Sequence, residues 1–210
     1  MSDTEQKQNA AKEIIEILKN KGYDAQYAAN TEDAKDLLLK MVPEYSIIGL
    51  GGSITLDKTG IIDILRKGKY NLIDRYNQPD KPAIFEAFRK ALQADYFLSG
   101  TNAITKNGEL VNVDCSGNRV AAMIYGPKRV IIVAGVNKIV NTLDDAFKRI
   151  KEIAPLNCKR FNSTAPCVKT GVCEDCDDPQ RMCNVTTVIH NGRKFEGRIS
   201  IIIIPEELGY

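Results

Sequence analysis

Hydrophobic positions along this 210-residue chain follow two different periods. Some stretches place apolar residues three and four positions apart, as one face of a helix requires, while shorter stretches are apolar throughout and end at turn residues. The first pattern predicts helices over residues 4–21, 31–41, 55–67, 81–93, 117–125 and 144–154. The second predicts strands over residues 46–50, 71–73, 96–100, 129–134, 185–190 and 199–204. Strands separated by helices imply an α/β fold, with a mostly parallel sheet and helices on both faces.

Two Asn-Gly pairs predict tight turns outside this regular alternation. The first, Asn107-Gly108, favours a hairpin in which residues near Ile104 and Leu110 face each other on antiparallel strands. The second, Asn191-Gly192, lies between the last two predicted strands and favours a C-terminal hairpin.

The composition changes at Pro155, where residues rich in Cys, Asn, Thr, Pro and Asp replace the periodic pattern up to residue 184. We therefore expect an α/β domain over residues 1–154. Residues 155–210 are expected to supply a small Cys-rich appendage and C-terminal strands that complete the same domain, since the appendage is too polar to form a core of its own.

Charge and terminal composition exclude several classes of function. The chain has 29 Lys and Arg against 27 Asp and Glu, a formal charge of +2, and no basic block that would indicate nucleic-acid binding. Its first residues are polar and lack the apolar core of a secretory signal. The longest aliphatic run, residues 199–205, is much shorter than the roughly 20 residues that span a bilayer. These features predict a cytoplasmic protein without a membrane span.

A glycine-rich segment between a predicted strand and a predicted helix is the first candidate ligand site. Open parallel sheets bind ligands at such positions, because glycines allow close approach and free N–H groups and hydroxyls attract anions. The simpler interpretation is a tight turn in which Ser53 caps the following helix. The candidate binding residues are Gly49, Gly51, Gly52, Ser53 and Thr55.

Two further polar clusters follow other predicted strands and can converge with the glycine-rich segment on one crevice. They supply candidate catalytic residues: Asp114 as a base, Asn102 as a donor to a developing oxyanion, and Arg119 as a clamp for a carboxylate or phosphate. The simpler alternative is that Asp114 and Asn118 stabilise turns while Arg119 lies on a helix surface.

The chain has a single histidine, His190, near its C-terminal end, which argues against histidine-based catalysis and against a multi-histidine zinc site. Cys115 lies within one of the polar clusters but has no histidine nearby in sequence to activate it. We therefore interpret Cys115 as a small buried residue rather than a nucleophile.

Four cysteines of the appendage have the spacing C-x5-C-x2-C-x6-C and are candidate ligands of zinc or an iron–sulfur cluster. A cytoplasmic chain with six cysteines favours thiols or metal ligands over disulfides, and a metal would hold the weakly apolar appendage together. Free thiols or a redox pair are the alternative. The four candidates are Cys167, Cys173, Cys176 and Cys183, and Cys158 lies just upstream.

The motifs together resemble the lactate-utilisation (LUD) domain family over about residues 10 to 155. The Cys-rich end is similar to that of short stand-alone members. The segments that carry the resemblance are residues 49–55, 59–62, 99–105, 108–110, 117–122, 126–128 and 133–135.

The resemblance implies a fold similar to sugar-phosphate isomerases and CoA-transferases, with the glycine-rich loop binding a phosphate or a CoA-like group. It further implies an accessory or redox role in lactate or 2-hydroxyacid oxidation to pyruvate, beside iron–sulfur partner subunits. The expected ligand of the glycine-rich loop is a small anionic metabolite or cofactor. One alternative is a freestanding isomerase- or CoA-transferase-like enzyme that acts on a phosphate- or carboxylate-bearing substrate, with Asp114 or Glu109 as base. Another is a non-enzymatic ligand-sensing module.

Overall fold

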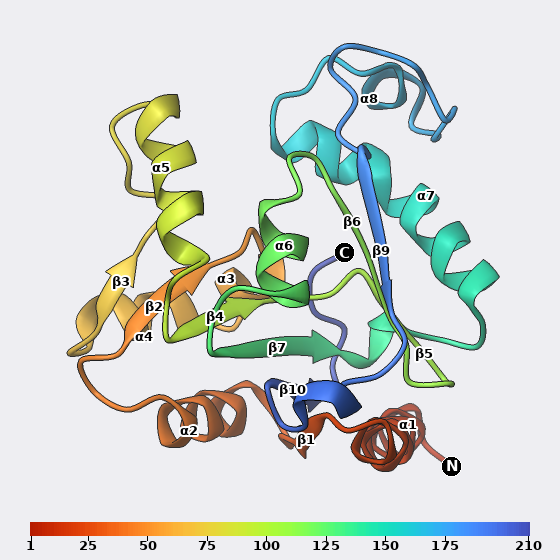
Figure 1. Ribbon diagram of the computed structural model, residues 1–210. Coiled ribbons are helices and arrows are strands. Elements are labelled where there is room, and N and C mark those ends of the chain that lie inside the picture. Colours follow the sequence, from red (N-terminus) through yellow and green to blue (C-terminus); the bar gives the residue numbers. More distant parts are fainter.

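A sheet of six strands forms the centre of the computed structural model, which describes residues 1–210 (Figure 1). The strand order is β1-β10-β7-β4-β2-β3, and every neighbouring pair is parallel, which confirms the predicted mostly parallel sheet. The strands are β1 Asp24–Tyr27, β2 Ile47–Leu50, β3 Asn71–Ile73, β4 Tyr96–Ser99, β7 Arg129–Gly135 and β10 Ile199–Ile204.

Helices cover both faces of this sheet, as the alternation of elements predicted. The helices are α1 Asp3–Asn20, α5 Lys81–Ala91 and α6 Asn118–Ile124 on one face, and α2 Thr31–Met41, α3 Ile54–Lys58 and α4 Ile61–Lys67 on the other. Strand β10 shows the consequence: Ile201 and Ile203 enter one core, and Ile202 and Ile204 enter the other. Because successive side chains of a strand point to opposite faces, a doubly covered strand is apolar at nearly every position.

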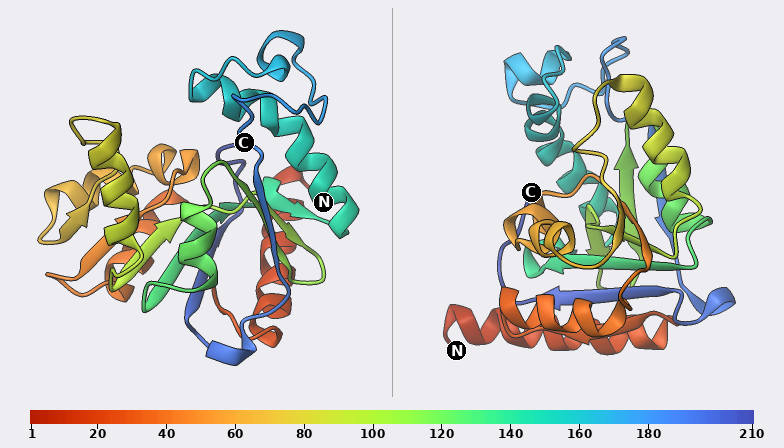
Figure 2. Two further views of the ribbon diagram at one scale, coloured as in Figure 1. Left: turned by 45° about the horizontal axis from the view of Figure 1, so that its top comes forward. Right: turned by 90° about the vertical axis from the view of Figure 1, so that its left-hand side faces the viewer.

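A second, smaller sheet with the strand order β8-β5-β6-β9 adjoins the main sheet (Figure 2). Its strands are β5 Ala103–Thr105, β6 Leu110–Asp114, β8 Ile139–Val140 and β9 Val185–Ile189. Ile104 lies opposite Leu110 in an antiparallel pair, which confirms the predicted turn at Asn107-Gly108. Helix α7, Leu143–Arg160, packs its Ala146 and Ile150 against this sheet.

The predicted C-terminal hairpin was wrong, because its two strands belong to different sheets. Strand β9 pairs with β6, whereas β10 lies between β1 and β7. The chain between them passes through a short helix, η2 Arg193–Phe195, after the N–H of Gly192 donates to the carbonyl of Lys21 at the end of α1. The physical reason lies in β10, where every residue is buried, and a two-stranded hairpin would leave one apolar face in water.

The structure also differs from the prediction at two helix boundaries and has two strands that were not predicted. The helix predicted over residues 55–67 is divided into α3 and α4, because Gly60 adopts a left-handed φ of +69°. The helix predicted to end at residue 154 continues through Pro155 to Arg160, so the compositional boundary falls inside α7. The unpredicted strands are β1, which has only one buried position among its four residues, and β8, which has only two residues.

After α7 ends at Arg160, the Cys-rich segment contains one further helix, α8, Pro166–Thr170. A one-turn helix, η1 Val136–Lys138, follows β7. No helix combines the length and the apolar character that crossing a bilayer requires.

Gly49 provides a test of the packing between β2 and α5. An added Cβ at Gly49 would lie 2.7 Å from the Cβ of Ala91 and 3.1 Å from the ring of Phe97. We expect Gly49→Ala to destabilise the protein by about 1–3 kcal/mol, because α5 must move away from the sheet. Urea unfolding measures this change. Gly52→Ala is the matched control and should cost less than about 1 kcal/mol, because its nearest neighbour is the end of a flexible arginine side chain at 3.3 Å. Equal losses in both variants would contradict this account.

Candidate functional site

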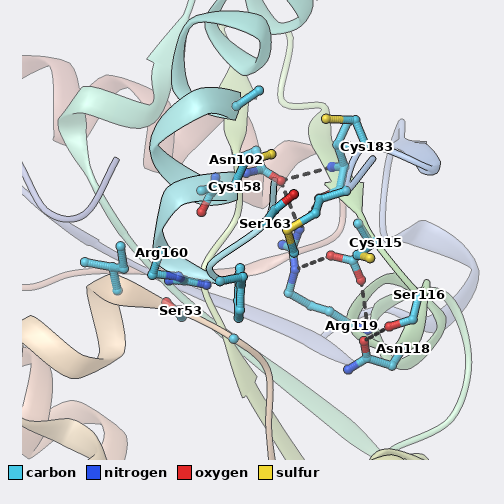
Figure 3. Close-up of a pocket in the computed structure, with 18 of the residues that line it drawn as sticks. Ser53, Asn102, Cys115, Ser116, Asn118, Arg119, Cys158, Arg160, Ser163 and Cys183 are labelled. Atoms are coloured by element: carbon cyan, nitrogen blue, oxygen red, sulfur yellow. Dashed lines mark hydrogen bonds and ion pairs between the residues drawn. The ribbon is translucent and has the colours of Figure 1, made fainter. Parts of the chain in front are cut away.

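A cleft of about 710 Å³ lies where β2, β4 and β6 end, between α5 and α7 (Figure 3). It brings together side chains from all three polar clusters of the sequence, including Ser53, Asn102 and Asp114. Six basic side chains line the cleft, whereas Asp114 is its only acidic one. The cleft therefore has the electrostatic character of an anion site. The basic residues are Arg75, Lys81, Arg119, Lys138, Arg160 and Arg181.

The glycine-rich segment divides into packing residues and cleft residues. Gly49 and Gly51 do not line the cleft, and a Cβ at Gly51 would lie 2.7 Å from the hydroxyl of Ser99. Gly52, Ser53 and Thr55 do line it. The Ser53 hydroxyl accepts the N–H of Leu56 at 3.2 Å and caps α3, as the simpler interpretation held, and the Thr55 hydroxyl donates to the carbonyl of Leu208.

Arg119 is buried in the wall of the cleft, and all five of its guanidinium N–H groups have acceptors within the protein. Its Nε donates to Asp114 at 2.8 Å in an ion pair whose side chains are about one-tenth exposed. This geometry favours a positioning role for Arg119 over the predicted ligand clamp, because no donor is left for a ligand. The other acceptors, at 2.7 to 3.2 Å, are the carbonyls of Gly100 and Val113 and the side-chain oxygens of Asn102 and Asn112.

Asp114 and Asn102 belong to the same network (Figure 3). The second carboxylate oxygen of Asp114 accepts the backbone N–H groups of Arg119 and Val120 at the start of α6. The side-chain oxygen of Asn102 accepts the N–H of Val113 as well as Arg119. Both candidate catalytic groups face the cleft, but their oxygens hold its wall together. Their predicted chemical roles stay predictions.

Two cations that the sequence analysis did not identify flank Gly52. A Cβ at Gly52 would lie 3.3 Å from Nη1 of Arg75 and 3.6 Å from Nη2 of Arg160, so both guanidinium groups converge on this point of the backbone. Arg75 stacks on Phe88 at 4.4 Å and Arg160 on Phe161 at 4.3 Å, and neither makes an ion pair. Burial and the neighbouring cation lower the pKa of Arg75.

Lys138 is a third cation that the sequence analysis missed. Its side chain is only 4% exposed, lines the cleft and has no hydrogen-bond or ion-pair partner. Burial, followed by Arg149, Arg119 and Lys58, lowers the pKa of Lys138 to about 7. Lys138 lies three residues after the end of β7 and Arg75 two residues after the end of β3, so the strand-end rule contained a signal for both. Arg160 lies at the end of a helix and gave no such signal.

Three other candidate residues have environments that limit their chemistry. Cys115 is exposed rather than buried, and partial burial and the Asp114 carboxylate raise the pKa of its thiol. His190 contacts Glu109 at 3.1 Å, and neither residue lines the cleft. Glu109 therefore cannot act as a base in the cleft. Of the two residues suggested as bases, only Asp114 faces the cleft.

The cysteines of the appendage gather beside the cleft. Cys158 and Cys183 line it, and both also line an adjoining small pocket of about 20 Å³ together with Cys167, Cys173 and Cys176. All six cysteines of the chain are free thiols. No group of three or more His, Cys, Asp or Glu side chains is arranged to hold a metal ion. The predicted zinc or iron–sulfur cofactor stays a prediction.

The cleft can bind an anion and can hold an apolar group next to it. Arg75, Arg160 and Lys138 supply positive charge, while α5 contributes Phe85 and Phe88 to the wall. Because Asp114, the only acidic side chain in the cleft, is already engaged by Arg119, binding is better supported than proton transfer.

Comparison with known proteins agrees with this fold. The LUD domain family matches residues 11–204 of the chain. A crystal structure of a DUF162 family protein from Deinococcus radiodurans is similar with a TM-score of 0.54 and 12% identity, covering 94% of this chain and 97% of that one. The structure of eIF2B delta from Chaetomium thermophilum gives a TM-score of 0.37 and 16% identity, covering 57% of this chain and 51% of that one. No curated protein matches the sequence.

The family match spans both sheets, the whole Cys-rich segment and all of the cleft lining except Gly209 and Tyr210. It agrees with the resemblance inferred from the strand-end motifs and extends that resemblance beyond residue 155. The likeness to the Deinococcus protein covers nearly the whole chain and supports the same fold. The chain therefore belongs to the LUD domain family.

Proposed function

We propose that this LUD-domain chain binds an anionic metabolite or cofactor in the cleft, as an accessory component in the oxidation of lactate or related 2-hydroxyacids. The observation that carries the proposal is the convergence of Arg75 and Arg160 on Gly52 without a carboxylate partner. Two adjacent, partly desolvated guanidinium groups repel each other, and a bound phosphate or carboxylate removes this repulsion.

Lys138 extends the positive surface toward the interior of the protein. An unpaired, nearly fully buried ammonium group is costly unless an anion accompanies it. The stacking of Arg75 on Phe88 holds one guanidinium group in place before a ligand arrives, which reduces the ordering cost of binding. Together the three cations favour a dianionic group such as a phosphate.

The proposed pathway role follows from family membership and from the chemistry of the reaction. Oxidation of a 2-hydroxyacid to a 2-oxoacid releases two electrons and two protons, so an electron acceptor is required. We assign that acceptor to iron–sulfur partner subunits, and to this chain the binding of the anionic ligand. An isomerase- or CoA-transferase-like activity is less well supported, since Asp114 is engaged and Glu109 does not face the cleft.

Replacing the converging arginines tests the anion site. We expect Arg75→Gln and Arg160→Gln each to weaken phosphate binding by at least about tenfold, because a hydrogen bond to a charged group contributes roughly 1.5–3 kcal/mol. Isothermal titration calorimetry with phosphate, sulfate, lactate, pyruvate and CoA measures the change and ranks the ligands. Arg89→Gln, on the exposed side of α5, removes the same charge and should bind like the wild type.

The ligand series also separates binding from function. Unchanged affinity in both cleft variants, or no binding of any of the five compounds to the wild type, would refute the anion site. Binding of phosphate and CoA without any effect on a reconstituted 2-hydroxyacid oxidation would overturn the pathway role but leave the site intact.

The pKa of Lys138 predicts how binding depends on pH. Because this pKa is lowered to about 7, protonation occurs as the pH falls from 8.5 to 6 and adds a positive charge to the cleft. Sulfate remains a dianion over this range, so its affinity should rise by several-fold, up to roughly tenfold, toward pH 6. Lys138→Met should bind as weakly as the wild type at high pH and lose the dependence. A wild-type affinity that is constant from pH 6 to 8.5 would contradict the prediction.

A further inference from the structure

Five of the six cysteines line one small pocket between the last turns of α7 and the segment that precedes β9. Cys158 belongs to α7 and Cys167 to α8, whereas the other three lie in irregular chain. Figure 3 shows Cys158 and Cys183 among the residues that line the cleft. The fold therefore gathers thiols that are up to 25 positions apart in the sequence.

The segment that carries these cysteines has little else to keep it folded. Between Phe161 and Asn184 its only regular element is the five-residue α8. The nearest core contains three buried residues, of which Cys158 and Cys167 are two and Ala165 is the third. A core of this size cannot offset the conformational entropy of more than twenty ordered residues.

Local interactions nevertheless hold the cysteine backbone in place. The Arg181 guanidinium donates to the carbonyls of Cys176 and Cys183 and forms an ion pair with Asp175 at 2.9 Å. Asp175 itself has a left-handed φ of +52°, which bends the chain sharply between Cys173 and Cys176. Residues 173–176 therefore form a tight C-x-x-C turn.

One cation, Arg181, lines the small pocket beside the five thiols. Its hydrogen bonds go to Asp175 and to the carbonyls of Cys176 and Cys183 rather than to sulfur. A thiophilic metal ion binds cysteine as thiolate and displaces the thiol protons, so it would supply the contacts to sulfur that Arg181 does not make.

From this arrangement we propose that the five-cysteine pocket holds a thiolate-bound metal centre in the wall of the anion cleft, with Cys158 of α7 among its ligands. Each ligand gives up its thiol proton and forms a sulfur–metal bond without a change in oxidation state. In their present arrangement the thiols do not form a group that could hold one metal ion. Binding therefore requires their side chains to rotate toward the pocket. The Cys158 ligand would join the appendage to the helix that packs on the second sheet.

Metal analysis of protein purified without oxygen tests this proposal. We expect about one zinc per chain, or iron with matching acid-labile sulfide and broad absorbance near 400 nm; either supports the site and identifies the metal. Cys158→Ser and Cys176→Ser should each lower the metal content at least tenfold. Cys115→Ser is the matched control, because Cys115 lines the cleft but not the small pocket, and it should keep the full metal content.

Hydrogen exchange provides a readout that does not depend on activity. Removing the metal with a chelator should increase exchange in residues 161–184 while β7 stays protected. Wild-type protein that takes up neither zinc nor iron with sulfide on anaerobic reconstitution would overturn the proposal. Loss of metal in Cys176→Ser but not in Cys158→Ser would exclude Cys158 as a ligand. Sulfate affinity is measured separately, so failure here leaves the anion site untouched.

Discussion

The side chain of Arg119 ties the two sheets of this protein together. It reaches from α6 to the carbonyl of Gly100 at the end of β4 and to Asn112 of β6, while its ion pair with Asp114 fixes the start of α6. Removing one partner of such a buried pair leaves an uncompensated charge, at a cost of about 3–5 kcal/mol. The cleft has a defined shape because this network holds the loop after β4 against the second sheet.

Much of the fold follows from sequence periodicity, because a parallel sheet covered on both faces requires the apolar runs found in β2, β4, β7 and β10. The failures share a physical cause. The turn signal at Asn191-Gly192 is local, whereas the position of β10 is decided by burial on two faces, which involves partners more than 60 positions away. Likewise Pro155 is a local signal for the end of a helix. Helix α7 nevertheless continues to Arg160, because Ala154, Pro155 and Cys158 are buried against the rest of the protein.

The candidate site was predictable only in part. The strand-end rule located Ser53 and Asn102 in one cleft, because β2 and β4 are parallel neighbours whose carboxyl ends meet at one edge. Asp114 reaches the same cleft from the end of β6, an antiparallel strand of the second sheet. Residue type could not show whether a cation is already paired: Arg119 uses every donor within the protein, while Lys138 and Arg160 use none. Pairing is decided by side-chain neighbours from distant segments, and these neighbours are known only once the chain is folded.

The order of strands also has a consequence for how the protein is made. Strand β1 pairs only with β10, so residues 24–27 leave the ribosome about 175 positions before their partner exists. Until then α1 has an apolar face without its sheet, and one side of β7 is an open edge. Such long-range closure slows folding and prolongs exposure to aggregation, so the nascent chain is expected to depend on chaperones more than its size alone would require.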